Sequence, residues 1–316
     1  MKQYPKIVFM GTPDFAVASL RALTDGGYNV VGVVTMPDKP AGRGQQIRFS
    51  PVKAFALAHH LPLLQPEKLK DAAFLEALRA WNADLHIVVA FRMLPEAVWA
   101  MPKLGTFNLH ASLLPQYRGA APINWAIING ETETGITTFF LTHEIDTGKV
   151  IDQVKIPIAD TDNAETVRNT LKNLGAELVV KTVEAIAQGN VQPTAQEAMG
   201  FNPSDLRPAP KIFKETCRIQ WNSPVKEIYD FIRGLSPHPG AWTELPTNSG
   251  EILSLKIFET EKIFQKHDLP PATIVSDGKK TMDIAAQDGF IRLKSVQQAG
   301  KKRLPIADFI CGKKKW

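Results

Sequence analysis

The sequence has 316 residues, 44% of them apolar and 22% charged, and this composition is typical of a globular protein of one large or two medium domains. The two cysteines, Cys217 and Cys311, lie far apart without metal-ligand spacing, so we expect reduced thiols in a reducing compartment. The apolar run within residues 1–15 is too short for a signal peptide, and no apolar stretch has the length of a membrane span. We therefore expect a cytoplasmic protein.

The net charge of +5 is unevenly distributed along the chain. Residues 1–204 carry 18 Lys and Arg against 19 Asp and Glu, whereas residues 205–316 carry 19 against 13. A basic segment joined to a neutral one indicates a polyanionic partner, with nucleic acid first. Charge alone leaves open that the excess serves only solubility.

The first elements predict a right-handed βαβ unit. Residues 6–10 form an apolar run that ends at Gly11, a helix is expected over residues 14–24, and residues 30–35 are apolar and β-branched. The first turn, at residues 11–14, is Gly-Thr-Pro-Asp and lacks the Gly-x-Gly-x-x-Gly fingerprint. A dinucleotide site is therefore disfavoured, although the pattern of elements resembles a Rossmann fold.

A basic segment follows at residues 36–49. Its two prolines and two glycines predict an irregular loop, which is either a solvated connection or a binding loop. Lys39, Arg43 and Arg48 lie within it, and Arg43 stands between two glycines, where its side chain would be free to reach a phosphate or a base edge.

Helices are expected next over residues 51–59 and 70–81. The first begins at Ser50-Pro51, with serine as N-cap and proline at the first helical position. Residues 85–90 are strongly apolar, as in the middle of a parallel sheet, and this strand ends in the loop 91–95.

The stretch from Gly105 to Gly119 holds the strongest candidate site. Asn108 and His110 are two residues apart in an expected strand and should point to the same face, and Pro115 ends the strand. Ligands of open α/β sheets bind off the carboxyl ends of strands. An amide can donate to a developing oxyanion and an imidazole can move a proton near neutral pH, although an isolated Asn-x-His pair is more often structural.

A helix over residues 122–129, strands over 135–142 and 149–156, and an amphipathic helix over 163–188 are expected to complete the first domain. Asp146 lies in the turn between the two strands, where aspartate before Thr-Gly is a common turn residue.

The best linker candidate is residues 192–214, because it holds four prolines with polar and basic neighbours. Beyond it, a helix is expected from Ser223-Pro224 to Arg233. The short strand-like runs that follow, separated by turn signals, predict a small barrel or sandwich. These runs are residues 241–245, 251–259, 272–276, 282–286 and 290–295.

Several motifs together resemble the signature of the formyltransferases that use 10-formyltetrahydrofolate. They are Asn108, His110, the run Ser112-Leu113-Leu114-Pro115, and Asp146 before a glycine. Two further runs, residues 11–15 and 117–125, are close to those of the members that act on methionyl-tRNA. The resemblance covers essentially the whole chain.

The resemblance implies an α/β fold: a Rossmann-like N-terminal domain with a mostly parallel sheet, and a smaller C-terminal β-barrel of the oligonucleotide-binding type. It implies that residues 1–206 are catalytic and bind folate, and that residues 207–316 bind tRNA. The implied reaction transfers the formyl group of 10-formyltetrahydrofolate, a co-substrate, to the amine of methionyl initiator tRNA. No metal is needed, and a monomer is expected.

The resemblance also implies roles for individual residues. Asn108 would donate a hydrogen bond to the formyl oxygen, His110 would relay the amine proton, and Asp146 would orient His110 and stabilise its imidazolium. The implied folate-binding residues are Phe91, Met93, Leu94, Ser112, Leu113, Leu114 and Pro115. The implied tRNA-binding residues are Lys39, Arg43, Arg48 and Lys211, and Arg43 matches the key arginine of the loop that enters the acceptor stem.

The loop 91–95 departs from the family pattern. Phe91-Arg92-Met93 replaces a tyrosine–glycine sequence and shortens the loop by one residue, so Arg92 could lie near the folate or face solvent.

Other functions remain open at this stage. Glycinamide ribonucleotide formyltransferase has the same Asn, His and Asp but is about as long as the first domain alone. Formyltetrahydrofolate hydrolysis and sugar-amine formyl transfer are further possibilities. An RNA-binding protein with a degenerate catalytic domain is the alternative from another class. A nicotinamide-dependent dehydrogenase would be inferred from the fold pattern alone.

Overall fold

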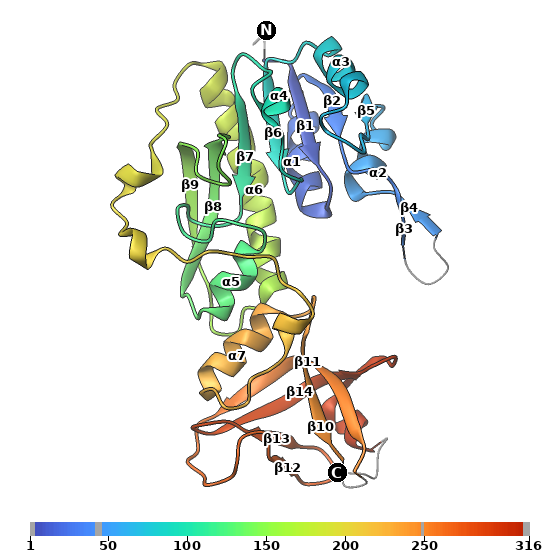
Figure 1. Ribbon diagram of the computed structural model, residues 1–316, viewed down its shortest axis with the longest axis vertical. Coiled ribbons are helices and arrows are strands. Elements are labelled where there is room, and N and C mark those ends of the chain that lie inside the picture. Colours follow the sequence, from blue (N-terminus) through green and yellow to red (C-terminus); the bar gives the residue numbers. More distant parts are fainter. Residues whose placement is uncertain (1–3, 42–45, 248–249, 312–316) are drawn as a thin grey trace. The chain divides into compact units, whose positions relative to one another are not determined.

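The computed structural model describes residues 4–41, 46–247 and 250–311 (Figure 1). The chain folds into two compact units, and neither unit is a single segment of the sequence. The first comprises the residues up to Gly119, Gly135–Ile156 and Arg168–Pro208; the second comprises Ala120–Thr134, Pro157–Val167 and the residues from Ala209 on.

The first unit is built on a seven-stranded sheet in the order β5-β2-β1-β6-β7-β8-β9. The first five of these strands pair in parallel, and β8 runs antiparallel to β7. The Rossmann-like, mostly parallel sheet is therefore confirmed. The strands are β1 (Ile7–Gly11), β2 (Val30–Val34), β5 (Leu63–Leu64), β6 (Leu85–Val89), β7 (Thr106–His110), β8 (Glu133–Phe140) and β9 (Val150–Pro157).

Two of the helices in this part of the chain begin at side-chain caps. Ser50 Oγ accepts a hydrogen bond from Lys53 N (3.0 Å), and Asp71 accepts one from Phe74 N (3.4 Å), which satisfies amides that have no partner within the helix. The helices are α1 (Asp14–Asp25), α2 (Pro51–Ala58), α3 (Ala72–Ala80), α4 (Glu96–Trp99) and α6 (Ala164–Ala187).

The basic segment 36–49 is more regular than its composition predicts. It contains a two-stranded antiparallel ribbon of β3 (Lys39–Ala41) and β4 (Gln46–Arg48), so the prediction of an irregular loop is wrong. Pro40 pairs with Ile47 in this ribbon, and a two-stranded ribbon has an open edge on which a residue without an amide hydrogen is tolerated. Residues 42–45, and with them Arg43, lie outside the described residues.

The second unit contains an antiparallel sheet in the order β10-β11-β14-β13-β12, with β15 also paired to β14. The register of β11 shifts on both sides of Glu259, and such bulges bend a strand and increase its twist. The sheet curls into a half-barrel, in agreement with the predicted small barrel. The strands are β10 (Ala241–Pro246), β11 (Ile252–Ile263), β12 (Ile274–Ser276), β13 (Met282–Ala285), β14 (Phe290–Gln298) and β15 (Arg303–Pro305).

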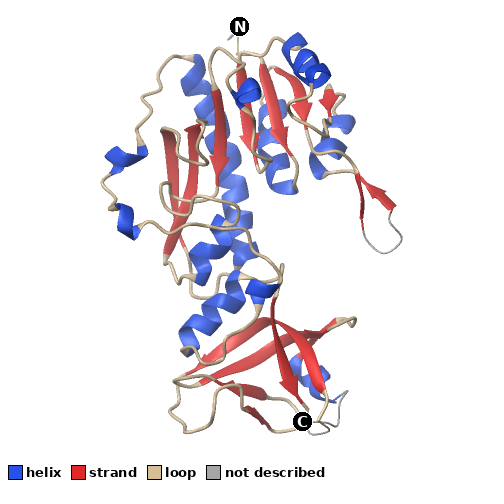
Figure 2. Cartoon of the chain, viewed as in Figure 1, coloured by secondary structure: helices blue, strands red, loops and turns tan. Residues whose placement is uncertain are grey.

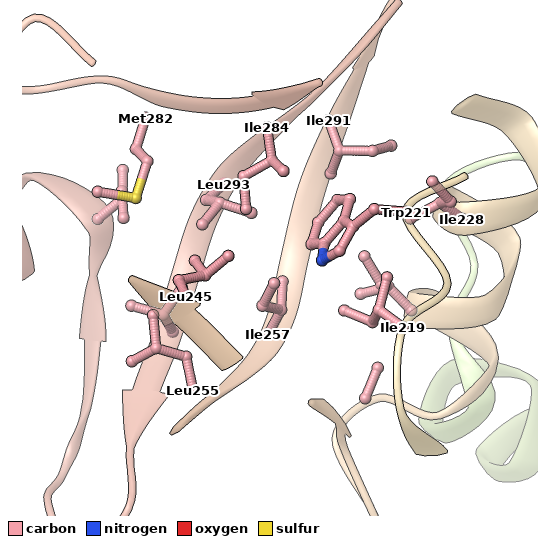
Figure 3. Packing of buried hydrophobic residues seen from close by; sticks show 14 of the residues in the cluster. Ile219, Trp221, Ile228, Leu245, Leu255, Ile257, Met282, Ile284, Ile291 and Leu293 are labelled. Atoms are coloured by element: carbon pink, nitrogen blue, oxygen red, sulfur yellow. The ribbon is translucent and has the colours of Figure 1, made fainter. Parts of the chain in front are cut away.

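The concave side of this sheet encloses an apolar core (Figure 3). Trp221 lies in it beside isoleucine and leucine side chains of the strands, and its indole nitrogen donates to Thr243 Oγ1 (2.8 Å). Among its described residues this unit contains the helices α5 (Pro122–Ile128), α7 (Val225–Gly234) and α8 (Ile306–Cys311) and the start of α6. The sequence did not predict β15 or α8.

The proline-rich segment predicted as a linker contains two short 3₁₀ turns, drawn as helix between tan loops in Figure 2. They are η1 (Gln196–Met199) and η2 (Pro203–Asp205), and a third, η3 (Glu215–Cys217), follows the segment. We call residues 192–208, which belong to the first unit, the connector. Within the described ranges, no helix is long and apolar enough to cross a membrane.

Candidate active site

Strand β7 carries the two central candidates at its carboxyl end. Asn108 pairs across the sheet with Val88 and Phe139, and His110 is the last residue of the strand, opposite Thr137. Because strand side chains alternate, Asn108 and His110 lie on the same face. Asn108 is half-buried, whereas His110 is only 6% exposed.

The two ring nitrogens of His110 have different neighbours. Its Nε2 lies 2.9 Å from the carbonyl oxygen of Tyr117, and because a carbonyl only accepts, Nε2 carries the hydrogen. In the neutral ring Nδ1 is then the free base, and it lies 3.8 Å from Asp146 Oδ2. The ring can therefore take a proton on Nδ1 beside a carboxylate that would stabilise the resulting imidazolium.

Asp146 is held in the turn between β8 and β9 by contacts on its carboxylate and its backbone. Its φ of +56° is left-handed, and Oδ2 accepts a hydrogen bond from Gly119 N (2.9 Å). Two residues later, a Cβ on Gly148 would lie 1.6 Å from Phe140 O, so only glycine fits. The glycine after Asp146 is thus required by the turn that presents the carboxylate.

The turn that follows β7 is fixed through Thr137, which is fully buried on β8. Thr137 Oγ1 donates to Ser112 O (2.6 Å) and accepts from Leu114 N (3.2 Å) and from the Gln153 amide (2.8 Å). Ser112 Oγ in turn donates to Gln116 O (2.6 Å). These hydrogen bonds hold the backbone of the turn at Ser112 and Leu114 against β8.

The predicted folate-binding run 112–115 is largely buried. The side chains of Ser112 and Leu114 are fully enclosed, and Leu114 packs with Phe139 and Val150 in a small apolar cluster. Any ligand at this turn can therefore meet only its backbone, half-buried Leu113 or the edge of Pro115.

The loop after β6 combines buried and exposed side chains. Leu94 is 7% exposed and Met93 is 74% exposed, with Phe91 between these limits. The guanidinium of Arg92 donates to the carbonyl oxygens of Glu67 (2.7 Å) and Pro66. Burial lowers the pKa of this guanidinium from its ordinary value. Arg92 therefore fastens one loop to the next.

Of the predicted tRNA-binding residues, the structure describes the side chains of Arg48 and Lys211, and both are exposed. Lys211 Nζ lies 5.4 Å from the centre of the Phe213 ring, a cation–aromatic contact at the surface of the second unit. Lys39 contributes its backbone to the β3–β4 ribbon opposite Arg48, and Arg43 is outside the described residues.

The base of the ribbon is held by Asp38. Its carboxylate accepts hydrogen bonds from the Lys53 ammonium and from the Gln65 amide (3.0 Å), and these bonds, with Lys53 the larger cause, lower its pKa. Over the part of the chain that the structure describes, no group of three or more His, Cys, Asp or Glu side chains is placed to hold a metal ion.

Sequence reasoning missed Gln196, which lies on the connector. Its buried amide donates to the carbonyl oxygens of Asp146 and Gly148 and accepts from Arg118. No local pattern marks Gln196, because its partners are 48 to 78 residues away in the sequence.

Two family models match the sequence. One, described as formyl transferase, covers residues 5–183, and the other, described as formyl transferase, C-terminal domain, covers residues 211–314. The chain is 67% identical over 311 residues to a methionyl-tRNA formyltransferase of Bacteroides thetaiotaomicron, a match that spans 98% of this chain and 96% of that protein. It is 52% identical over 307 residues to one of Flavobacterium johnsoniae, with 97% and 96% covered.

Solved structures share the fold at lower identity. An N-formyltransferase of Helicobacter canadensis, in complex with folinic acid and dTDP-3-aminofucose, matches with a TM-score of 0.65 at 20% identity over 93% of this chain and 99% of that one. HypX of Aquifex aeolicus in complex with tetrahydrofolic acid matches with a TM-score of 0.63 at 19% identity over 97% and 47%.

Proposed function

The chain belongs to the formyl transferase family, and from this premise we propose how its own residues carry out the reaction. It transfers the formyl group of 10-formyltetrahydrofolate to the α-amine of methionyl initiator tRNA and yields N-formylmethionyl-tRNA and tetrahydrofolate. 10-Formyltetrahydrofolate is a co-substrate. The attacking group is the substrate's own amine, so no enzyme nucleophile is needed.

We assign the oxyanion to Asn108. As the amine attacks the formyl carbon, the carbonyl oxygen gains negative charge, and an amide fixed at the carboxyl end of β7 can donate to it. Such a donor typically contributes about 2.7–4 kcal/mol to transition-state stabilisation.

We assign the proton to Nδ1 of His110. The amine loses a proton when its new bond to carbon forms, and the departing N10 of the folate gains one when its bond to that carbon breaks. Nδ1 is the free base of the neutral ring and can take the first proton and return it as the second. Asp146, 3.8 Å away, stabilises the imidazolium between these steps.

The observation that carries this proposal is the pair of contacts on His110. A buried imidazole with one nitrogen hydrogen-bonded to a carbonyl and the other facing a carboxylate has a defined tautomer and a defined place for a proton. Asn108 lies on the same face of the strand and supplies the hydrogen-bond donor that the formyl oxygen requires.

We propose that residues 1–206 form the catalytic, folate-binding domain, and that the backbone around 112–115 with Phe91, Met93 and Leu94 borders the folate. Residues 207–316 and the β3–β4 ribbon would contact the tRNA through Lys39, Arg43, Arg48 and Lys211. The exposure of Arg48 and Lys211 and the basic excess after residue 204 support this assignment. Translation takes place in the cytoplasm, and there the protein would act as a monomer, because one chain supplies Asn108, His110 and Asp146.

The test is incubation of the protein with 10-formyltetrahydrofolate and methionine-charged initiator tRNA, followed by assay of N-formylmethionine after ester hydrolysis. Glycinamide ribonucleotide, a sugar amine and water serve as parallel acceptors. We expect formylmethionine with silent controls. Tetrahydrofolate formed only with another acceptor would overturn the assignment of the tRNA, and no turnover at all would overturn the chemistry. Light scattering of the same sample tests the monomer.

A further inference from the structure

The turn at Asp146 has an unusual backbone conformation, and its carboxylate faces His110. Asp146 has φ +56°, a conformation that a side chain with a Cβ seldom adopts, and neighbouring Ile145 is 61% exposed. A turn of this kind keeps its shape only when surrounding groups fix it. The group that does so comes from the connector.

We infer that Gln196 on the connector and Arg118 are positioning residues that hold Asp146 against His110. The inference rests on the proposed function for its kinetic consequence, but not for its geometry. Gln196 is 2% exposed, and its Nε2 donates to Asp146 O and to Gly148 O, both at 2.8 Å. One amide group thus joins both ends of the turn across Thr147.

The orientation of this amide is fixed by its other end. Gln196 Oε1 accepts from Arg118 Nε (3.0 Å) and Nη2 (2.6 Å). Arginine only donates and carbonyls only accept, so a flipped amide would lose all four bonds. The charged donor makes the pair stronger than a neutral hydrogen bond.

Arg118 lies between the two residues that hold the catalytic pair. Tyr117 O accepts from His110 Nε2, and Gly119 N donates to Asp146 Oδ2. Three consecutive residues therefore fix the histidine, the connector glutamine and the carboxylate. The contacts form a closed ring that runs from Asp146 through Gly119, Arg118 and Gln196 back to the backbone of Asp146.

The connector is fastened on both sides of this ring. Thr194 exchanges two backbone hydrogen bonds of 2.8 Å with Val150, the first residue of β9. At the other end, Gln116 accepts from Arg207 N and donates to Asp205 O, both at 2.9 Å, and Tyr117 N donates to Arg207 O (2.7 Å). The connector is thus part of the catalytic site rather than a passive tether.

The test uses Gln196→Glu in the full chain. Glutamate has nearly the same shape and still accepts from Arg118, but it cannot donate to Asp146 O and Gly148 O. We expect kcat for Met-tRNA formylation to fall about 10- to 100-fold with KM for 10-formyltetrahydrofolate nearly unchanged, because the carboxylate is displaced while the folate site is not. Arg118→Lys keeps the charge, loses the paired donation and should show a smaller loss of the same kind.

A second readout does not depend on activity. The backbone amide of Gly119 donates to Asp146 Oδ2 (2.9 Å), so its ¹H–¹⁵N NMR signal should shift in Gln196→Glu, because the carboxylate that it binds is displaced. Asn190→Asp is the control for the same amide-to-carboxylate change, since exposed Asn190 in the first unit donates an amide hydrogen to Gln188 Oε1 (3.2 Å). It should leave kcat and the Gly119 signal as in the unaltered protein.

The outcomes separate the inference from the proposed function. An unchanged kcat and an unchanged Gly119 signal in Gln196→Glu would overturn the positioning role while the formyl transfer of the unaltered protein stands. Equal losses of kcat, folate affinity and thermal stability in both variants would show a merely structural contact and would also overturn it. If the unaltered protein formylates nothing, the proposed function fails, and the Gly119 signal still decides whether Gln196 positions Asp146.

Discussion

His86 and His110 lie on neighbouring parallel strands of one sheet, both buried, in opposite chemical surroundings. His86 stands at the amino end of β6, opposite Thr106, and is 1% exposed; within the described residues its Nδ1 has no hydrogen-bond partner. Burial lowers the pKa of His86 to about 4, and a hydrogen bond with the Val98 backbone only partly opposes this. His110, at the carboxyl end of β7, has a carbonyl on one nitrogen and a carboxylate beside the other.

The difference between their surroundings shows which neighbours allow a buried histidine to act as a base. Burial alone keeps the ring neutral because it disfavours the charged form, whereas a nearby carboxylate stabilises the protonated ring. The carboxyl ends of parallel strands open into turns that can supply such partners. The two ends of the same sheet should therefore respond to substitution in different ways.

The largest effect is expected from Asp146→Asn. Asparagine keeps an oxygen for the Gly119 amide but removes the charge that faces His110 Nδ1, so kcat should fall about 10³- to 10⁴-fold while tetrahydrofolate binding survives. Steady-state kinetics and folate titration measure the two separately. Asp152→Asn, which removes a surface ion pair with Lys181 in the same unit, is the control and should change kcat little. Turnover retained in Asp146→Asn would refute the role of the carboxylate.

A somewhat smaller loss is expected from Asn108→Ala. It removes the proposed oxyanion donor and leaves both contacts of His110 in place, so kcat should fall about 10²- to 10³-fold, with a pH–rate profile of unchanged shape. A changed profile would mean that Asn108 acts through His110 instead of on the formyl oxygen.

Substitution of His86 should change the pH dependence of the unfolding free energy rather than the activity. The pKa of His86 is about 4 in the fold against 6.5 for an unperturbed histidine, so between these pH values the unfolded chain binds more protons. Stability from the neutral ring is therefore full above about pH 6.5 and is lost as pH falls toward 4. Between pH 7 and 5 the unfolding free energy should fall by about 2 kcal/mol more in the unaltered protein than in His86→Gln.

Urea unfolding at the two pH values measures this difference. The carboxylates with lowered pKa, such as Asp84, whose carboxylate accepts from Lys6 N, act equally in both proteins and cancel in the comparison. Parallel pH profiles would show that His86 is not held neutral by the fold.

The sequence predicts the elements around these sites better than the contacts within them. Alternation along β7, the stop at Pro115 and the cap at Ser50 are local rules, and each predicted element was found within a few residues of its expected ends. The β3–β4 ribbon escaped prediction because composition indicated a loop, while pairing across an open edge tolerates Pro40.

The missing part of the site is long-range. Gln196 and Arg118 are 78 residues apart, and Arg92 reaches back about 25 residues to two backbone carbonyls, which carry no sequence signal. Likewise, the burial of the Ser112 and Leu114 side chains depends on how the turn packs on Thr137 and Phe139. Such contacts are set by tertiary packing, which periodicity and turn chemistry do not encode.

The smallest effect is expected at a third histidine, His143, which has a carboxylate neighbour but no burial. Its Nε2 lies 3.5 Å from Glu96 Oε1, and its side chain is 72% exposed. The centre of its ring lies 5.2 Å from that of Trp99, in an edge-to-face arrangement. Exposed pairs of this kind contribute about 0–1 kcal/mol and are screened by salt, so His143→Ala should change the unfolding free energy by about 0.5 kcal/mol or less and leave kcat as it is. Urea unfolding at low and high salt with parallel kinetics tests this. A large loss of kcat would show that a histidine beside a carboxylate can serve catalysis without being buried. The difference between His86 and His110 would then be due to the carboxylate alone.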